Sequence, residues 1–321
     1  MAHIKYTQRD VVVMTDPNQL CEMAVSLYQT DPERAYALFV EAAQQGFPNA
    51  FFGMAEMKMA GTGTEKDPDG AVELYTLAAE AGHPPSMYRL GVYYSGNVGK
   101  EDPDKCRFWF ECAAEAGMAQ AYPEIAGIYL YGYGTPQDTA KAYHWYRRAA
   151  DEGDPLSMFK VGYMCSEGVG TQKDMDEAIR MFRMSAVAGV PEAMFKMATL
   201  ARDGVIAGGS KTAFTWYRSA ADVGFPPAMF NLATMYYEGD GTDRDLSKAF
   251  DLYSRVAETG DGDALFMVGR MYFEGLGVEK DQGKGFEFFG RAAAAGNRLA
   301  IQLMDDIRRR QNTQLIHIDG S

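Results

Sequence analysis

Ser157 and Lys160 have the Ser-x-x-Lys spacing of penicillin-interacting enzymes, in which the serine is the nucleophile. Ser95-Gly-Asn97 and Lys211-Thr212 are weakly similar to the other motifs of those enzymes. A nucleophile needs a site that several elements fix in place. Ser157 instead occupies a repeat position that always holds alanine or serine, and Lys160 falls on the solvent side. The motif favours helix packing, and acyl transfer stays open as an alternative.

The other groups that could bind a ligand favour structural roles. Gly-x-Gly turns are typical of nucleotide loops, but here they follow helices and no Gly-Lys-Ser/Thr comes after them. The acidic pairs Asp67/Asp69 and Asp261/Asp263 lack the remaining ligands of a calcium loop and are interpreted as helix caps. The histidines and cysteines show neither metal-ligand spacing nor a C-x-x-C pair, and we expect the cysteines to be buried apolar residues. We therefore expect no catalytic residue, no metal and no cofactor.

Composition excludes several kinds of partner. The 321 residues carry 31 Lys and Arg against 44 Asp and Glu, a net charge of −13, which argues against nucleic acid. No apolar run is long enough for a membrane span, and the N-terminus does not have the pattern of a signal peptide. These features predict a cytoplasmic protein that does not insert into membranes.

A glycine recurs at nearly constant spacing and closes the same phrase, aromatic-x-x-Ala-Ala-x-x-Gly, in most copies. A regular period of this length is typical of a solenoid, in which one small unit stacks on copies of itself. The closing glycines, numbered position 0 below, are Gly46, Gly82, Gly117, Gly153, Gly189, Gly224, Gly260 and Gly296.

Each repeat predicts two helices. In the first, positions +4, +8 and +9 are small or apolar and lie on one helical face. Position +9 is always glycine or alanine, which indicates close approach of another helix backbone. A Gly-x-Gly turn ends this helix, and an aspartate commonly starts the second, as at Asp138 and Asp245. The methionines and aromatic residues at +5 and +6 are interpreted as core between repeats, with an adaptable peptide-binding stripe as the alternative. The turn at 204–209 departs from the pattern.

The repeat Ala-x-x-x-Leu-Gly-x-x-Tyr, then Gly-x-Gly, then Ala-x-x-(Trp/Leu)-Tyr-x-x-Ala-Ala-x-x-Gly resembles the Sel-1-like repeat, a relative of the tetratricopeptide repeat. The resemblance covers about residues 17–305 and implies an all-α, right-handed α/α superhelical solenoid of about eight helix-pair repeats. We expect a tail over 1–15, the solenoid over 16–296, a capping helix over 297–310 and a tail over 311–321. It also implies a non-enzymatic adaptor, commonly bacterial, that holds a partner protein in its concave groove. Some cysteine-rich relatives were described as β-lactamases, but their paired cysteines are missing here.

The resemblance places the first helix of each repeat on the concave side, where positions +3, +7, +10 and +14 face outward. These positions hold cationic or amide groups in mid-helix and acidic groups near the turn. They predict a wall for an extended peptide with basic segments, on a monomer or weak homo-oligomer. The alternatives are a solvated polar face and self-assembly through the tails or the acidic edge. The candidate partner-binding residues are Arg89, Lys160, Tyr163, Lys196, Asn231, Arg270, Glu167, Asp203, Glu238 and Glu274.

Overall fold

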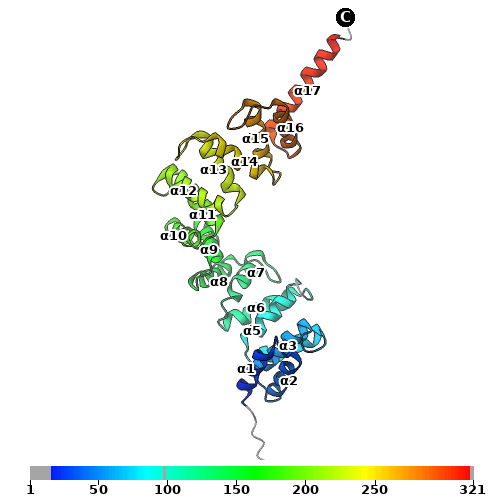
Figure 1. Ribbon diagram of the computed structural model, residues 1–321. Coiled ribbons are helices and arrows are strands. Elements are labelled where there is room, and N and C mark those ends of the chain that lie inside the picture. The colour runs from blue at the N-terminus through cyan, green and yellow to red at the C-terminus, as the bar shows by residue number, and fades with distance from the viewer. Residues whose placement is uncertain (1–15, 97–98, 319–321) are drawn as a thin grey trace, which may run out of the picture. The chain divides into compact units, whose positions relative to one another are not determined.

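A computed structural model describes residues 16–96 and 99–318, with side chains through residue 309, and all its regular elements are α-helices (Figure 1). First and second helices alternate along the chain. The first helices are α1 (Pro17–Leu27), α3 (Pro48–Ala60), α5 (Pro84–Tyr94), α7 (Ala121–Tyr131), α9 (Pro155–Glu167), α11 (Pro191–Arg202), α13 (Pro226–Glu238), α15 (Gly262–Glu274) and α17 (Arg298–Ile318). The second helices are α2 (Pro32–Ala43), α4 (Pro68–Glu80), α6 (Pro103–Glu115), α8 (Thr139–Asp151), α10 (Met175–Val187), α12 (Gly209–Asp222), α14 (Leu246–Ala257) and α16 (Gln282–Ala294).

The chain divides into two compact units, residues 1–152 with 169–171 and residues 153–168 with 172–321. Unit 1 contains α1–α8 and unit 2 contains α9–α17. Within each unit, every helix packs against the next one along the chain. Short helices that hide their apolar faces only against neighbours are the basis of a solenoid. The predicted all-α solenoid of helix pairs is therefore confirmed.

The predicted helix ends are confirmed by hydrogen bonds. Asp138 accepts from the backbone N of Lys141 at 3.0 Å, and Asp245 accepts from that of Lys248 at 3.0 Å. These bonds satisfy amide groups that have no partner inside the helix. Seven of the second helices begin with an aspartate that caps in this way: Asp31, Asp67, Asp102, Asp138, Asp174, Asp245 and Asp281. The turn at 204–209, which departs from the repeat pattern, differs because α12 begins after Gly208 with no side-chain cap.

The second glycine of each Gly-x-Gly turn joins one repeat to the one before it. At Gly134, φ is +64°, and a Cβ there would lie 2.4 Å from the carbonyl oxygen of Pro103, at the start of the preceding second helix. The same close approach to backbone recurs at Gly63, Gly241 and Gly277. Glycine is thus required twice, once for the left-handed backbone and once for space.

Close packing at position +9 is present, but the nearest neighbour is an aromatic ring of the following second helix, not its backbone as predicted. A Cβ on Gly162 would lie 2.7 Å from the ring of Phe182 and 3.2 Å from the carbonyl oxygen of Ala178. The residue at +9 also matches the type of ring. Glycine accompanies phenylalanine and alanine accompanies tyrosine in the pairs Gly91/Phe110, Gly162/Phe182, Gly269/Phe289, Ala55/Tyr75, Ala126/Tyr146, Ala198/Tyr217 and Ala233/Tyr253.

Where the ring that packs against position +9 is a tyrosine, its hydroxyl group makes a hydrogen bond. The hydroxyl of Tyr253 lies 2.7 Å from Thr234 Oγ1, and that of Tyr217 lies 3.3 Å from Thr199 Oγ1, both threonines at position +10. Burial raises the pKa of Tyr253 to about 12, so the hydroxyl stays protonated at neutral pH. A buried hydroxyl needs such a partner. The +10 residue of these repeats therefore has an internal structural role.

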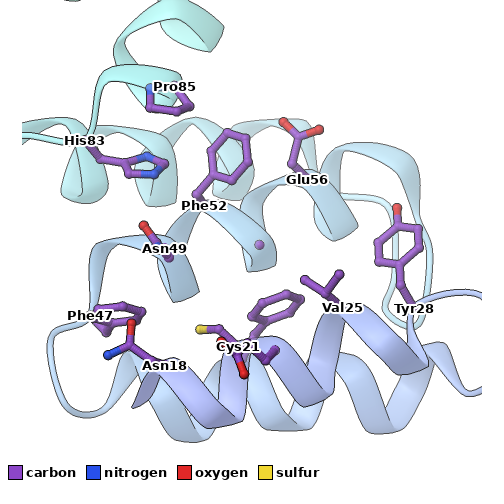
Figure 2. Close-up of a pocket in the computed structure, with 13 residues that line it drawn as sticks. Asn18, Cys21, Val25, Tyr28, Phe47, Asn49, Phe52, Glu56, His83 and Pro85 are labelled. Atoms are coloured by element: carbon purple, nitrogen blue, oxygen red, sulfur yellow. The ribbon is translucent and has the colours of Figure 1, made fainter. Parts of the chain in front are cut away.

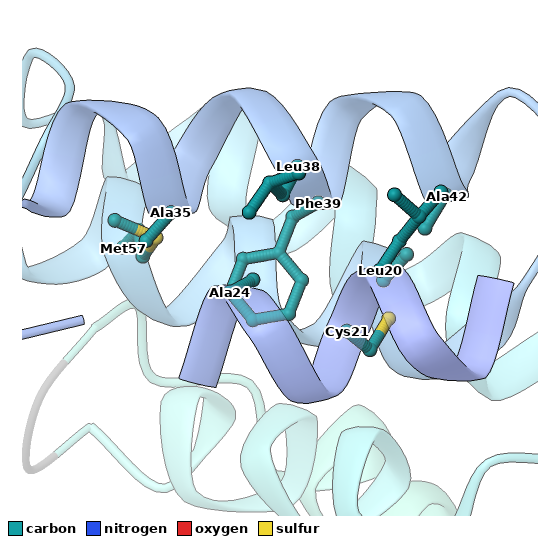
Figure 3. Packing of buried hydrophobic residues seen from close by; sticks show 9 residues of the cluster. Leu20, Cys21, Ala24, Ala35, Leu38, Phe39, Ala42 and Met57 are labelled. Carbon is teal, nitrogen blue, oxygen red and sulfur yellow. The ribbon is translucent and has the colours of Figure 1, made fainter. Parts of the chain in front are cut away.

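The cores confirm the interpretation of the methionines and cysteines. Of the four +5 methionines, Met158, Met194 and Met229 are at most 9% exposed, as core residues are, and Met87 is half-buried. Three of the four cysteines are also buried, among them Cys21, and none of the four forms a disulfide. Figure 3 shows Cys21 in the first cluster, where side chains of α1, α2 and α3 surround the ring of Phe39. This burial does not support a binding stripe at +5, whereas the aromatic residues at +6 are half-buried, and two of them, Phe52 and Phe230, border cavities.

The last helix is longer than the sequence pattern predicts. The expected capping helix covers 297–310, whereas α17 runs from Arg298 to Ile318, so 311–318 are helical. Ala300 is fully buried, as expected of the small residue at +4, while Leu299 is 59% exposed. The expected tail over 1–15 lies outside the described residues.

Candidate functional site

The ten candidate residues are exposed or half-buried, although Thr199 and Thr234 at the outward position +10 bond to buried tyrosines. Arg89 lies on α5 of unit 1, and the other candidates lie on, or directly after, first helices of unit 2. Lys160, Lys196 and Asn231 are half-buried. The exposed candidates are Arg89, Tyr163, Glu167, Asp203, Glu238, Arg270 and Glu274.

Several of these side chains already have partners within their own unit. Arg89 forms an ion pair with Glu56 of α3 at 2.8 Å, and Arg270 pairs with Glu274 one helical turn later at 2.9 Å. Asp203 pairs with its neighbour Arg202 at 3.4 Å. Exposed pairs of this kind contribute little to stability. They support, for these residues, the alternative of a solvated polar face.

Lys160 and Lys196 differ from them, because neither ammonium group meets a carboxylate among the residues that the structure describes. They occupy position +7 of α9 and α11, and Lys196 Nζ lies 5.9 Å from the ring centroid of Phe182. On α13 the same position is Asn231, which borders a cavity of about 250 Å³ together with Pro227 and Phe230. This part of unit 2 offers two cationic donors, and the Asn231 amide nitrogen already donates to the carbonyl oxygen of Pro227 at 3.1 Å.

A larger cavity of about 710 Å³ opens on the first helices of unit 1 (Figure 2). It lies between α1 and α3 and reaches the start of α5. Its lining combines several aromatic rings with a few polar groups, as small-ligand and peptide sites commonly do. The lining residues are Asn18, Cys21, Glu22, Val25, Tyr28, Phe39, Phe47, Asn49, Phe52, Gly53, Glu56, His83 and Pro85.

Gly53 explains why the cavity opens here. It occupies position +7 of α3, where α5, α9 and α11 carry arginine or lysine side chains. A Cβ on Gly53 would lie 2.5 Å from the ring of Phe39, which therefore rests directly against the α3 backbone. On α3 the outward positions +3, +7 and +10 are Asn49, Gly53 and Glu56, and all three line the cavity.

Hydrogen bonds fix the polar rim of this cavity. Glu56 accepts from the hydroxyl of Tyr75 and pairs with Arg89. Burial, together with the adjacent Glu56 carboxylate, raises the pKa of Tyr75 far above its usual range. His83 Nδ1 lies 2.9 Å from Ser86 Oγ, and burial lowers the pKa of His83. The imidazole is therefore neutral at pH 7 and adds no positive charge to the cavity.

The enzyme alternative finds no support in the geometry of Ser157. Its side chain is 1% exposed, and its Oγ has no hydrogen-bond partner among the described atoms. A nucleophile must reach both a base and its substrate. Lys160 is at the surface, and Asn97 of the second motif fragment lies outside the described residues.

Within residues 16–96 and 99–318, His, Cys, Asp and Glu side chains do not gather in threes or more to hold a metal ion. Over the same ranges, no helix combines the length and the apolar character that crossing a bilayer demands.

The sequence matches the Sel1 repeat eight times, over residues 26–47, 48–83, 84–118, 124–154, 155–190, 191–225, 226–261 and 262–297. The chain belongs to the Sel1 repeat family. The predicted resemblance is thereby confirmed, with repeat boundaries at or close to the closing glycines for most copies.

Solved structures agree with this membership. A Sel1 repeat protein from Oxalobacter formigenes is 26% identical, with 95% of this chain and 97% of that chain covered, at a TM-score of 0.73. A protective antigen of uropathogenic Escherichia coli with an SLR fold is 22% identical, covering 92% of this chain and 80% of that one, at a TM-score of 0.56, and shows the fold alone. No curated protein matches the sequence.

Proposed function

We propose that this Sel1 repeat protein is a non-enzymatic scaffold that binds a partner protein or peptide along its first helices. In unit 2 the binding residues are Lys160, Lys196 and Asn231, with Tyr163 exposed beside them. The acidic groups Glu167 and Glu238, near the turns of unit 2, select basic segments of the partner. Asp203, Arg270 and Glu274 are already held in ion pairs beside them, and Arg89 lies in unit 1 and is no part of this surface.

The two lysines without carboxylate partners carry this proposal. The chain has an excess of acidic residues, yet the half-buried residues Lys160 and Lys196 form no ion pair among the described residues. A half-buried lysine packs its apolar stem against the protein and keeps its ammonium group accessible, so both charges are available to a partner. Carbonyl or carboxylate oxygens of a bound segment would supply the missing acceptors.

Replacing Lys160, Lys196 and Asn231 together with alanine is expected to reduce capture of specific partners from native lysate about tenfold or more, since such central contacts dominate binding. A matched variant removes two exposed lysines and one exposed amide elsewhere in unit 2, Lys173, Lys211 and Gln282. It should capture partners like the parent chain. Full retention by the first variant, with helix content unchanged by circular dichroism, would exclude these residues as the binding site.

A further inference from the structure

We propose that the cavity between α1, α3 and the start of α5 binds an extended segment of a partner protein, which inserts an apolar side chain flanked by a lysine or arginine. The proposal rests on the scaffold function and adds to it a second site in unit 1, with its own selectivity. We call this cavity, with its thirteen lining residues, the anchor pocket.

The interior of the anchor pocket selects an apolar side chain. Phe39 lines it from α2, Phe47 from the residue before α3 and Phe52 from α3, and Cys21 lines it from α1 (Figure 2). Its volume of about 710 Å³ falls in the range of cavities that enclose small ligands. Val25, at the edge, is 67% exposed although it is apolar. Insertion of an apolar group would remove this surface from water.

The charges around the anchor pocket select a basic neighbour for that side chain. Its charged lining residues are Glu22 and Glu56, and no lysine or arginine lines it. Arg89 neutralises Glu56, whereas Glu22 has no cation partner within the described chain. Opposite charges across an interface favour encounter and fix register. The same acidity disfavours a second copy of this chain, whose net charge is −13.

Two amides can hold the backbone of an extended segment. Asn18 of α1 and Asn49 of α3 lie on opposite sides of the anchor pocket (Figure 2). Asn18 donates to Asp16 at 3.2 Å, which leaves its carbonyl oxygen as an acceptor, and Asn49 has no bonded partner among the described residues. An amide side chain both donates and accepts, as the peptide backbone does.

The probe is a library of random linear 12-residue peptides displayed on phage and selected on the full chain. Enriched peptides are expected to carry a large apolar residue beside lysine or arginine. Synthetic fluorescent copies are then titrated by polarisation. Asn49→Arg, which places a cation over the anchor pocket, should weaken binding about tenfold. The Glu22→Lys variant should prefer synthetic peptides in which the lysine or arginine has been replaced by glutamate. Glu41→Lys, on the exposed surface of α2, should leave the preference for basic peptides unchanged.

Other outcomes overturn the proposal in distinguishable ways. Peptides that tolerate Asn49→Arg but are lost with the Lys160, Lys196 and Asn231 alanine variant would refute the anchor pocket and leave the scaffold function standing. Peptides unaffected by either variant, or no enrichment at all, would refute both. An unchanged preference in Glu22→Lys would remove the basic selectivity. Binding seen only after deletion of residues 1–15 would make that segment the occupant in place of a partner.

Discussion

Replacing Gly134 with alanine is expected to lower the free energy of unfolding of unit 1 by about 3 kcal/mol. Two costs add at this residue. A left-handed backbone disfavours any side chain by about 1–2 kcal/mol. The new Cβ would also meet the Pro103 carbonyl oxygen at 2.4 Å, which forces the turn away from α6. Urea denaturation followed by circular dichroism measures the loss, and hydrogen exchange should show faster opening around the start of α6.

Gly117→Ala separates the two costs. This closing glycine has φ of +86°, but no atom lies within 4 Å of the position of its Cβ. It should lose only the conformational part, about 1–2 kcal/mol. Equal losses for the two variants would show that the contact between the turn and the preceding repeat contributes nothing to stability.

Gly162→Ala is expected to destabilise unit 2 by about 1–2 kcal/mol, against the usual helix preference for alanine. Alanine in a helix interior normally stabilises by about 0.5–1 kcal/mol. At Gly162 the added Cβ would lie 2.7 Å from the buried ring of Phe182, and the Ala178 carbonyl blocks a shift of the helix. The overlap outweighs the gain in helix propensity, because Phe182 is fully buried and cannot move aside.

The matched variant for this second test is Gly127→Ala, in the interior of α7. There the nearest atom to the added Cβ is the Tyr146 hydroxyl oxygen, at an ordinary 3.7 Å. This change should stabilise unit 1 by about 0.5–1 kcal/mol. The two variants should thus shift the thermal midpoint in opposite directions. If Gly162→Ala stabilises the protein, the claim that the Phe182 ring leaves no space for a Cβ at position +9 is wrong.

The repeat fold could be predicted from sequence because each signal is local and recurs. A capping aspartate such as Asp138, a turn glycine such as Gly132 and a small +9 residue each state their structural role within a few residues, and the structure confirms these roles. The extension of α17 was missed because the sequence after residue 310 leaves the repeat, and with it the pattern that marks helix ends. The sequence shows that glycine at +9 accompanies phenylalanine and alanine accompanies tyrosine. The contact between the +9 residue and that ring in the structure explains the pairing.

The candidate site was predicted only in part. Helical periodicity places the ten candidate residues at exposed or half-buried positions, but it does not identify the inward hydrogen bonds of Thr199 and Thr234 at +10. The ion pair between Arg89 and Glu56 joins separate repeats, which periodicity alone does not identify. The anchor pocket was missed because its cause is a missing side chain at Gly53. A glycine has no side chain that would indicate a binding site, and the Phe39 ring that packs against Gly53 comes from another helix, α2.

The most direct test of partner binding on the first helices is site-specific photocrosslinking. Tyr163 on first helix α9 and Phe108 on second helix α6 are 50% and 51% exposed, so each accepts a benzoylphenylalanine probe at equal accessibility. On irradiation in native lysate, the probe at 163 should give discrete partner adducts and the probe at 108 should give none. Adducts from 108 with none from 163 would contradict binding along the first helices.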